Sequence, residues 1–231
     1  MNPAATVLLA GASGLVGSSV LDLLLSQAGG PRVLAPVRRP IDARSARLMA
    51  PVSSLSADAD PDLLERLRHE SPAIDAYVCC LGTTIKVAGS QAAFRAVDFD
   101  AVLAFARAAQ AAGASRLGVV SALGADVKSS VFYNRVKGET EQALVGLSLP
   151  HLVIARPSLL LGERSALGQP SRPGERLAQV LMPAVGWLIP RKLRPISADA
   201  VAAALLAALA DAQPGTTVLE SDALQALAQP A

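Results

Sequence analysis

The chain has 231 residues, of which 52% are hydrophobic, 3% aromatic and 17% charged, with a formal net charge of +2. This length fits one α/β domain with C-terminal elaborations, and the near-neutral charge without a basic stripe argues against nucleic-acid binding. No uninterrupted apolar run reaches the length of about 18 residues that a spanning helix needs, so no membrane span is predicted.

Apolar runs alternate with helical patterns along the chain. In the first half, strands are predicted over residues 6–10, 32–37, 52–55 and 76–81, and helices over 15–26 and 60–69. In the second half, strands are predicted over 117–120 and 151–155, and helices over 91–112, 131–147 and 198–210. Residues 162–176 read as a loop and residues 225–231 as a frayed end.

The predicted strands are continuous apolar runs, which indicates burial on both faces of a sheet. Strands that alternate with helices of this length predict an α/β fold with a doubly wound parallel sheet, the Rossmann fold. One domain over residues 1–231 is expected. Right-handed crossovers then bring the loops at the carboxyl ends of the strands to one edge.

A glycine motif lies between the first predicted strand and the first predicted helix. Gly11 permits a tight turn, Gly14 lets the backbone approach a pyrophosphate, and Gly17 lets the helix pack near the strand. The helix N-terminus offers N–H groups and partial positive charge to phosphate. The loop residues expected to bind a dinucleotide are Gly11, Ser13, Gly14, Leu15 and Gly17.

The end of the second predicted strand indicates which dinucleotide binds. An acidic residue there would bond the ribose 2′-OH of NAD, whereas an arginine would pair with the 2′-phosphate of NADP. The chain has Arg38 and Arg39 at this point and no acid until Asp42. Guanidinium groups suit a phosphate dianion, so NADP(H) is favoured over NAD(H).

A second candidate cofactor segment follows the strand predicted over residues 76–81. Gly82 allows the chain to pass close to the adenosine side of a dinucleotide, and the threonine after it can bond the cofactor. This expectation depends on the predicted fold. The residues assigned to it are Leu81, Gly82 and Thr83.

Tyr133 and Lys137 are four residues apart on a predicted helix and therefore share a face. Carbonyl reduction needs a proton at oxygen, and a tyrosine, with an ordinary pKa of about 10, donates it better beside an ammonium that stabilises phenolate. Ser121 ends the strand over 117–120 and is placed to bond the substrate oxygen. Ser129 and Ser130 are the alternatives.

The remaining reactive residue types indicate no metal and no disulfide. Cys79 and Cys80 are adjacent, so they point to opposite faces of a strand and form neither a staple nor a CxxC pair. His69 and His151 lack metal-ligand spacing. Residues 1–25 contain no Lys or Arg, so a signal peptide is not predicted. Reduced thiols then favour a cytoplasmic location.

Taken together, the motifs resemble the short-chain dehydrogenase/reductase superfamily, and within it the atypical group that contains the Tat-interacting protein and its bacterial relatives. The matching stretches span most of the first 176 residues and are specific at family level, but they do not name a substrate. They are GASGLVG, VCCLGTT, VDFDAVLAFARAA, VVSALGAD, SSVFYNRVKGETE and ARPSLLLGERSALGQPSRPGE.

The resemblance implies an NADP(H)-binding Rossmann domain with Ser121, Tyr133 and Lys137 as the active triad. It also implies that Pro157 lies against the nicotinamide carboxamide and that residues 162–231 form the substrate side. The group often carries a second hydroxyl residue directly after the serine, and this chain has Ala122 there. If that second hydroxyl is the useful one, Ser121 is mis-assigned.

Three functions remain open from the sequence. The first is a reductase or dehydrogenase acting on a small or apolar carbonyl or alcohol. The second is an NADP(H)-binding regulator or scaffold without turnover, acting through a protein partner. The third is an epimerase or dehydratase with a tightly held cofactor. A homodimer is compatible with each of them.

Overall fold

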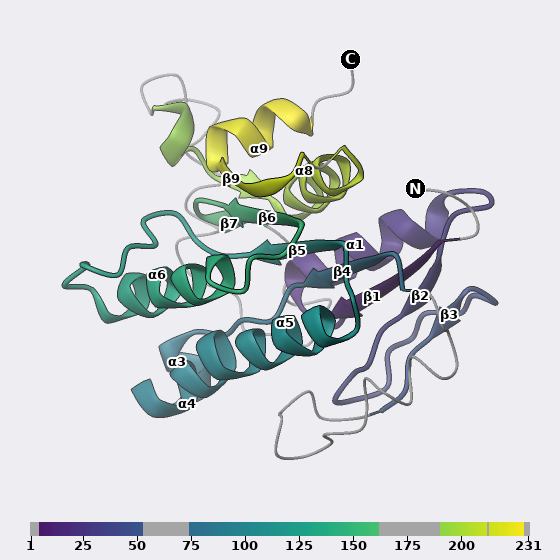
Figure 1. Ribbon diagram of the computed structural model, residues 1–231, viewed down its shortest axis with the longest axis horizontal. Coiled ribbons are helices and arrows are strands. Elements are labelled where there is room, and N and C mark those ends of the chain that lie inside the picture. Colours follow the sequence, from purple (N-terminus) through teal and green to yellow (C-terminus); the bar gives the residue numbers. More distant parts are fainter. Residues whose placement is uncertain (1–4, 53–73, 162–189, 212, 229–231) are drawn as a thin grey trace.

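A parallel sheet forms the centre of the molecule (Figure 1). The computed structural model describes residues 5–52, 74–161, 190–211 and 213–228. Its seven-stranded sheet has the order β3-β2-β1-β4-β5-β6-β9, and every pairing between neighbours is parallel. The strands are β1 (Thr6–Ala10), β2 (Arg32–Leu34), β3 (Leu48–Met49), β4 (Ala76–Cys79), β5 (Arg116–Val120), β6 (His151–Arg156) and β9 (Gly215–Glu220).

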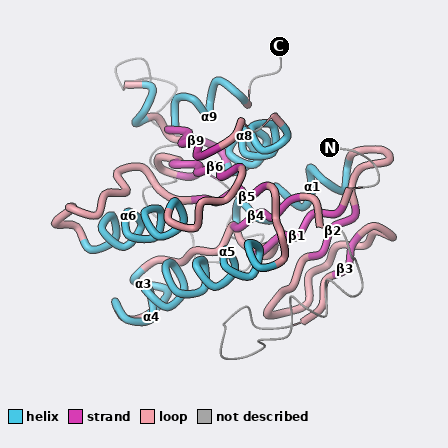
Figure 2. Tube along the Cα trace, viewed as in Figure 1, coloured by secondary structure: helices cyan, strands magenta, loops and turns pink. Residues whose placement is uncertain are grey.

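Helices cover both faces of this sheet (Figure 2), and a separate small sheet has two strands. α5 and α6 pack on one face, and α1 and α8 pack on the other. The described helices are α1 (Leu15–Ser26), α3 (Ile85–Ala88), α4 (Gln91–Arg95), η1 (Ala96–Ala101), α5 (Val102–Ala111), α6 (Phe132–Val145), η3 (Arg191–Leu193), α8 (Ala198–Ala210) and α9 (Ser221–Leu227). The small sheet pairs β7 (Leu160–Leu161) with β8 (Ile196–Ser197).

Side chains of β1 point alternately to the two faces of the sheet, which shows why the strand is apolar throughout. Val7 and Leu9 belong to the core shared with α1 and α8, whereas Leu8 and Ala10 belong to the core shared with α5 and α6. All four side chains are fully buried. The continuous apolar run is therefore explained by burial on both faces, and the predicted doubly wound parallel sheet is confirmed.

Several predicted elements differ from the observed ones. The third strand is β3, and only Val52 of the predicted strand 52–55 is described, in an isolated bridge to Val37. The predicted helix 91–112 contains a π-helical turn, η1, between α4 and α5. The frayed end predicted over 225–231 is wrong for its first residues, which belong to α9. The predicted helix 60–69 and loop 162–176 lie outside the described residues.

Among the described residues, no helix combines the length and apolarity that crossing a bilayer would require.

The strand β9 was not predicted. It is an edge strand with a partly exposed face, so its two threonines interrupt the apolar pattern that marks the central strands.

Candidate functional site

The glycine loop joins β1 to α1, and neither its first nor its third glycine leaves room for a side chain. Gly11 has a φ of +82°, and its carbonyl oxygen accepts the N–H of Gly14 at 2.9 Å. A Cβ added at Gly17 would lie 2.0 Å from the Gly11 carbonyl oxygen. The first turn of α1 therefore packs directly on the loop, and its N-terminal N–H groups point out of the helix where a phosphate would be bound.

Backbone contacts tie this loop to the segment after β4. A Cβ added at Gly11 would lie 2.6 Å from the Cys80 carbonyl oxygen, and one at Gly82 would lie 3.7 Å from Lys137 Nζ. The glycine loop, the segment from Leu81 to Gly82 and the lysine of α6 thus follow one another along the carboxyl edge of the sheet. Gly11 leaves no room for a side chain, whereas a Cβ at Gly82 would make only ordinary contacts beside Lys137. A bare backbone at Gly11 fits an extended dinucleotide that lies against the loop.

Helix α6 presents a line of polar side chains at intervals of four residues. Tyr133, Lys137 and Glu141 share one face of the helix, as the spacing requires. Tyr133 is partly buried, and its ring centroid lies 5.3 Å from that of Phe94. The predicted Tyr–Lys pair therefore sits on a regular helix whose first turn is held by aromatic packing.

Lys137 is paired with an aspartate that the sequence reasoning did not single out. Its Nζ lies 2.7 Å from Asp98 Oδ1, and the two side chains are 6% and 0% exposed. Asp98 Oδ2 also accepts the N–H of Thr83 at 2.8 Å. Burial opposes the charge of Lys137, but the attraction of Asp98, followed by that of Tyr133, raises the pKa of the lysine above its ordinary value.

Ser121 directly follows β5 and is buried, whereas Ser129 is partly buried and Ser130 is exposed. Its Oγ donates a hydrogen bond to Glu141 Oε1 at 2.5 Å, and its N–H donates to the Ala155 carbonyl at 2.7 Å. Ser129 instead accepts the N–H of Val131 within its own turn, and Ser130 is exposed. Among the three serines, the structure therefore places Ser121 at the carboxyl edge beside α6.

Glu141 and Arg156 form a second ion pair behind Ser121. Arg156 Nε lies 3.0 Å and 3.1 Å from the two oxygens of Glu141, and its Nη2 bonds Oε2 as well. Arg156 Nη1 also bonds Glu220 Oε1 at 3.0 Å, which links β6 to the end of β9. Sequence reasoning missed both residues, although Glu141 follows Lys137 by the same interval that separates Lys137 from Tyr133.

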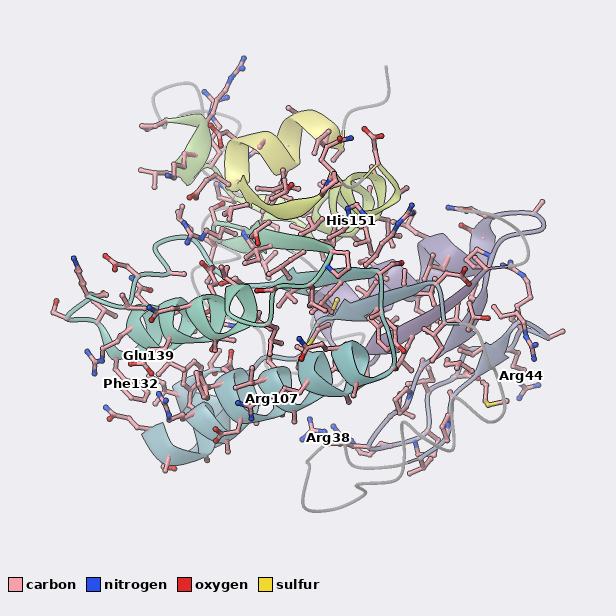
Figure 3. The ribbon with its side chains drawn as sticks, viewed as in Figure 1. Arg38, Arg44, Arg107, Phe132, Glu139 and His151 are labelled. Carbon is pink, nitrogen blue, oxygen red and sulfur yellow. The ribbon has the colours of Figure 1, made fainter. Side chains whose placement is uncertain are left out.

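The remaining predicted cofactor residues lie at two places. Arg38 and Arg39 are exposed in the segment that follows β2, where Figure 3 shows Arg38 apart from Arg44. Pro157 is buried directly after β6, and its carbonyl accepts the N–H of Leu123 at 2.9 Å. The loops after β5 and β6 therefore touch each other, whereas the arginines lie on the other side of β1 in the strand order.

Within the part of the chain that the structure describes, no cluster of three or more His, Cys, Asp or Glu side chains could hold a metal ion. Cys79 and Cys80 are free thiols, one buried and one partly buried.

We expect both cysteines to resist alkylation in the folded protein. Burial, opposed in part by a backbone hydrogen bond, raises the pKa of Cys79 from 9.0 to about 12, and burial also raises the pKa of Cys80. At pH 8 this lowers the thiolate fraction of Cys79 about a thousandfold. An alkylating reagent such as iodoacetamide should react slowly with the native protein and quickly with the protein unfolded in urea. Fast reaction of either thiol in the native protein would contradict the buried environment of these cysteines.

The fold and these contacts define a class, that of NAD(P)-binding Rossmann-type proteins. A family model described as NAD(P)H-binding matches residues 11–177. The chain belongs to this NAD(P)H-binding family.

Curated relatives of similar length support the assignment. Protein FMP52, mitochondrial, of Coccidioides immitis is 34% identical over 193 residues, covering 80% of this chain and 76% of the relative. Protein fmp52, mitochondrial, of Emericella nidulans is 33% identical over 182 residues, covering 79% and 76%. The expectation of a cytoplasmic location is wrong on this comparison, because these relatives are named as mitochondrial proteins.

Solved structures share the fold at low sequence identity. UDP-glucose 4-epimerase of Thermotoga maritima, solved with UDP-glucose, superposes with a TM-score of 0.70 at 15% identity, covering 93% of this chain and 75% of that one. MoeE5 in complex with UDP-glucose and NAD gives a TM-score of 0.68 at 16% identity, with the same coverage. The predicted resemblance is thus confirmed for the NAD(P)-binding fold.

Proposed function

We propose that the protein is an NADP(H)-dependent oxidoreductase that acts on a small or apolar carbonyl or alcohol. The observation that carries this proposal is the arrangement at the carboxyl edge of the sheet. The glycine loop, the segment at Gly82 and the α6 face of Tyr133 and Lys137 follow one another there. A dinucleotide lying along this edge would bring its nicotinamide end to Tyr133 and Ser121.

The cofactor preference rests on charge. Arg38 and Arg39 follow β2, the strand next to β1, and both side chains are exposed. Their guanidinium groups can form charge-assisted hydrogen bonds to a 2′-phosphate. The first acidic residue beyond them, Asp42, lies three positions after Arg39 and follows Pro40. NADP(H) is therefore the proposed cofactor.

The proposed chemistry divides between cofactor and chain. The nicotinamide supplies or accepts the hydride. Tyr133 gives a proton to the substrate oxygen in reduction and takes it back in oxidation. Lys137 holds the ribose hydroxyls and keeps positive charge near the phenol, while Asp98 fixes the lysine in place at 2.7 Å.

Two further assignments complete the proposal. Residues 1–231 form one domain, with residues 162–231 contributing the substrate side. Among the described residues of that region, η3 adjoins the carboxyl end of β9, where Lys192 Nζ lies 3.5 Å from Glu220 Oε2. Pro157 would then lie between the cofactor and this region.

Replacing Tyr133 by Phe tests the proposal directly. The change removes the proton donor and keeps the ring that packs on Phe94, so turnover should fall by about 10²–10⁴-fold while the Kd for NADPH stays unchanged. The measurements are NADPH oxidation over a panel of carbonyl compounds and a fluorescence titration with NADPH. Turnover equal to that of the wild type would remove Tyr133 from the mechanism.

A second function, a cofactor-binding regulator without turnover, is favoured by one observation. Asp98 neutralises Lys137 in a buried pair, which weakens the field that the ammonium exerts at Tyr133. This function predicts no NADPH oxidation over the panel and a protein partner whose capture depends on added NADPH. Partner binding that is indifferent to NADPH would contradict a redox-sensing role.

A further inference from the structure

We propose that Glu141 is a positioning residue that fixes the direction of the Ser121 hydrogen bond. In this arrangement Ser121 faces the site as an acceptor and recognises a hydrogen-bond donor, the hydroxyl of an alcohol. The proposal rests on the proposed function, because it assigns the form of the substrate that Ser121 contacts.

The first step is the charge of Glu141. Its side chain is 8% exposed, a degree of burial that disfavours a lone carboxylate. Arg156 compensates by bonding both carboxylate oxygens through Nε and Nη2, a bidentate arrangement that stabilises the ionised form. An ionised carboxylate can only accept hydrogen bonds. The proton between Glu141 and its serine partner therefore belongs to the serine.

The second step is the single proton of Ser121. A hydroxyl carries one donor and two acceptor lone pairs, and the donor of Ser121 is directed at Glu141 Oε1, 2.5 Å away. The backbone of Ser121 is fixed by its N–H bond to the Ala155 carbonyl, and the residue is buried. Only lone pairs remain for a group in the site. An alcohol hydroxyl can donate to them, whereas a carbonyl oxygen cannot.

The third step is the way in which Glu141 itself is held. It lies on the α6 face that carries Tyr133 and Lys137. Arg156 is anchored in turn by Glu220 at the end of β9. Glu139, two residues earlier on α6, pairs with the partly exposed Arg95 instead. The two glutamates are therefore matched in residue type, helix and ion pairing, and only Glu141 bonds the candidate serine.

Glu141→Gln should invert the Ser121 hydrogen bond. The amide oxygen would take the position beside Arg156, and the amide NH₂ would then face Ser121 and donate to it. The serine proton would be released toward the site. Ser121 would change from an acceptor to a donor with little change in side-chain volume, and Glu139→Gln serves as the matched control.

Infrared spectroscopy of the free protein, with ¹³C-labelled glutamate carboxyl groups, tests the Glu141–Ser121 bond without any ligand. Glu141→Gln identifies the band of Glu141, which should be that of an ionised carboxylate and should shift in Ser121→Ala. The band removed by Glu139→Gln should not shift in Ser121→Ala. A Glu141 band that is unmoved by Ser121→Ala, or that belongs to a protonated acid, overturns the proposal.

Binding of a probe pair tests the acceptor role. Cyclohexanol is titrated into the NADPH-loaded protein and cyclohexanone into the NADP⁺-loaded protein, so that neither complex turns over. Glu141→Gln should lower the ratio of alcohol to ketone affinity by about fivefold to tenfold, and Glu139→Gln should leave it unchanged. An unchanged ratio in folded Glu141→Gln, or no binding of either probe, overturns the assignment of an alcohol to Ser121.

The two measurements separate this inference from the proposed function. If the wild-type protein binds neither NADPH nor NADP⁺, the proposed function fails, and the infrared result still decides whether Glu141 holds the Ser121 proton. If the cofactor binds and the infrared shift is missing, the proposed function stands and the role of Glu141 falls.

Discussion

Gly17→Ala should lower the affinity for NADPH by about a hundredfold and reduce the thermal stability of the protein. The new Cβ would lie 2.0 Å from the Gly11 carbonyl oxygen, so the loop and the start of α1 must separate. Overpacking of this kind costs about 1–3 kcal/mol. A loop that relaxes in the free protein must be forced back when cofactor binds, and about 3 kcal/mol corresponds to about a hundredfold in Kd.

Gly146→Ala is the matched control for this substitution. Gly146 follows α6 with an ordinary helical φ of −62°, and a Cβ there would meet its nearest neighbour at 3.4 Å. We expect unchanged NADPH affinity and a melting temperature equal to or above that of the wild type. Equal NADPH affinity in the Gly17→Ala and Gly146→Ala variants would show that the glycine loop does not hold the cofactor.

Asp98→Asn should have the largest effect on folding among the substitutions considered. It preserves shape and removes the negative charge beside Lys137, whose side chain is 6% exposed. Leaving a buried charge without its partner costs about 3–5 kcal/mol. The free energy of unfolding in urea measures this loss. The double variant Asp98→Asn/Lys137→Met also removes the lysine charge, so it should recover part of the lost stability.

The exposed ion pair on the same helix gives the comparison. Glu139 pairs with Arg95, and their side chains are 31% and 41% exposed. Solvent screens such a pair, so Glu139→Gln should cost less than about 1 kcal/mol. If Asp98→Asn destabilised the protein no more than Glu139→Gln does, the result would contradict a buried ion pair between Asp98 and Lys137.

Local patterns carried most of what the sequence could predict. The glycine motif and the spacing of Tyr133 and Lys137 are readable because a tight turn and a helical face are set by residues close together in the chain. The parallel sheet followed from apolar runs that are buried on both faces. These signals located the carboxyl edge and the residue types along it.

The partners of those residues could not be predicted from local patterns. Asp98 and Asp100 lie two residues apart in a run that reads as one helix, and the π-helical turn η1 shifts the phase there. Only the fold decides that Asp98 is buried against Lys137 while Asp100 is exposed. Glu141 had a helical-spacing signal, but its partner Arg156 is set by the pairing of β5 with β6.

The most direct test of an NADP(H) site is a comparison of the Kd values of the wild-type protein for NADPH and NADH. The guanidinium groups after β2 should make NADPH bind at least about tenfold more tightly, as charge-assisted hydrogen bonds to a phosphate would. Arg38→Ala should remove much of this preference, and Arg44→Ala should leave it intact. Equal affinities, tighter binding of NADH, or no binding of either would contradict the account.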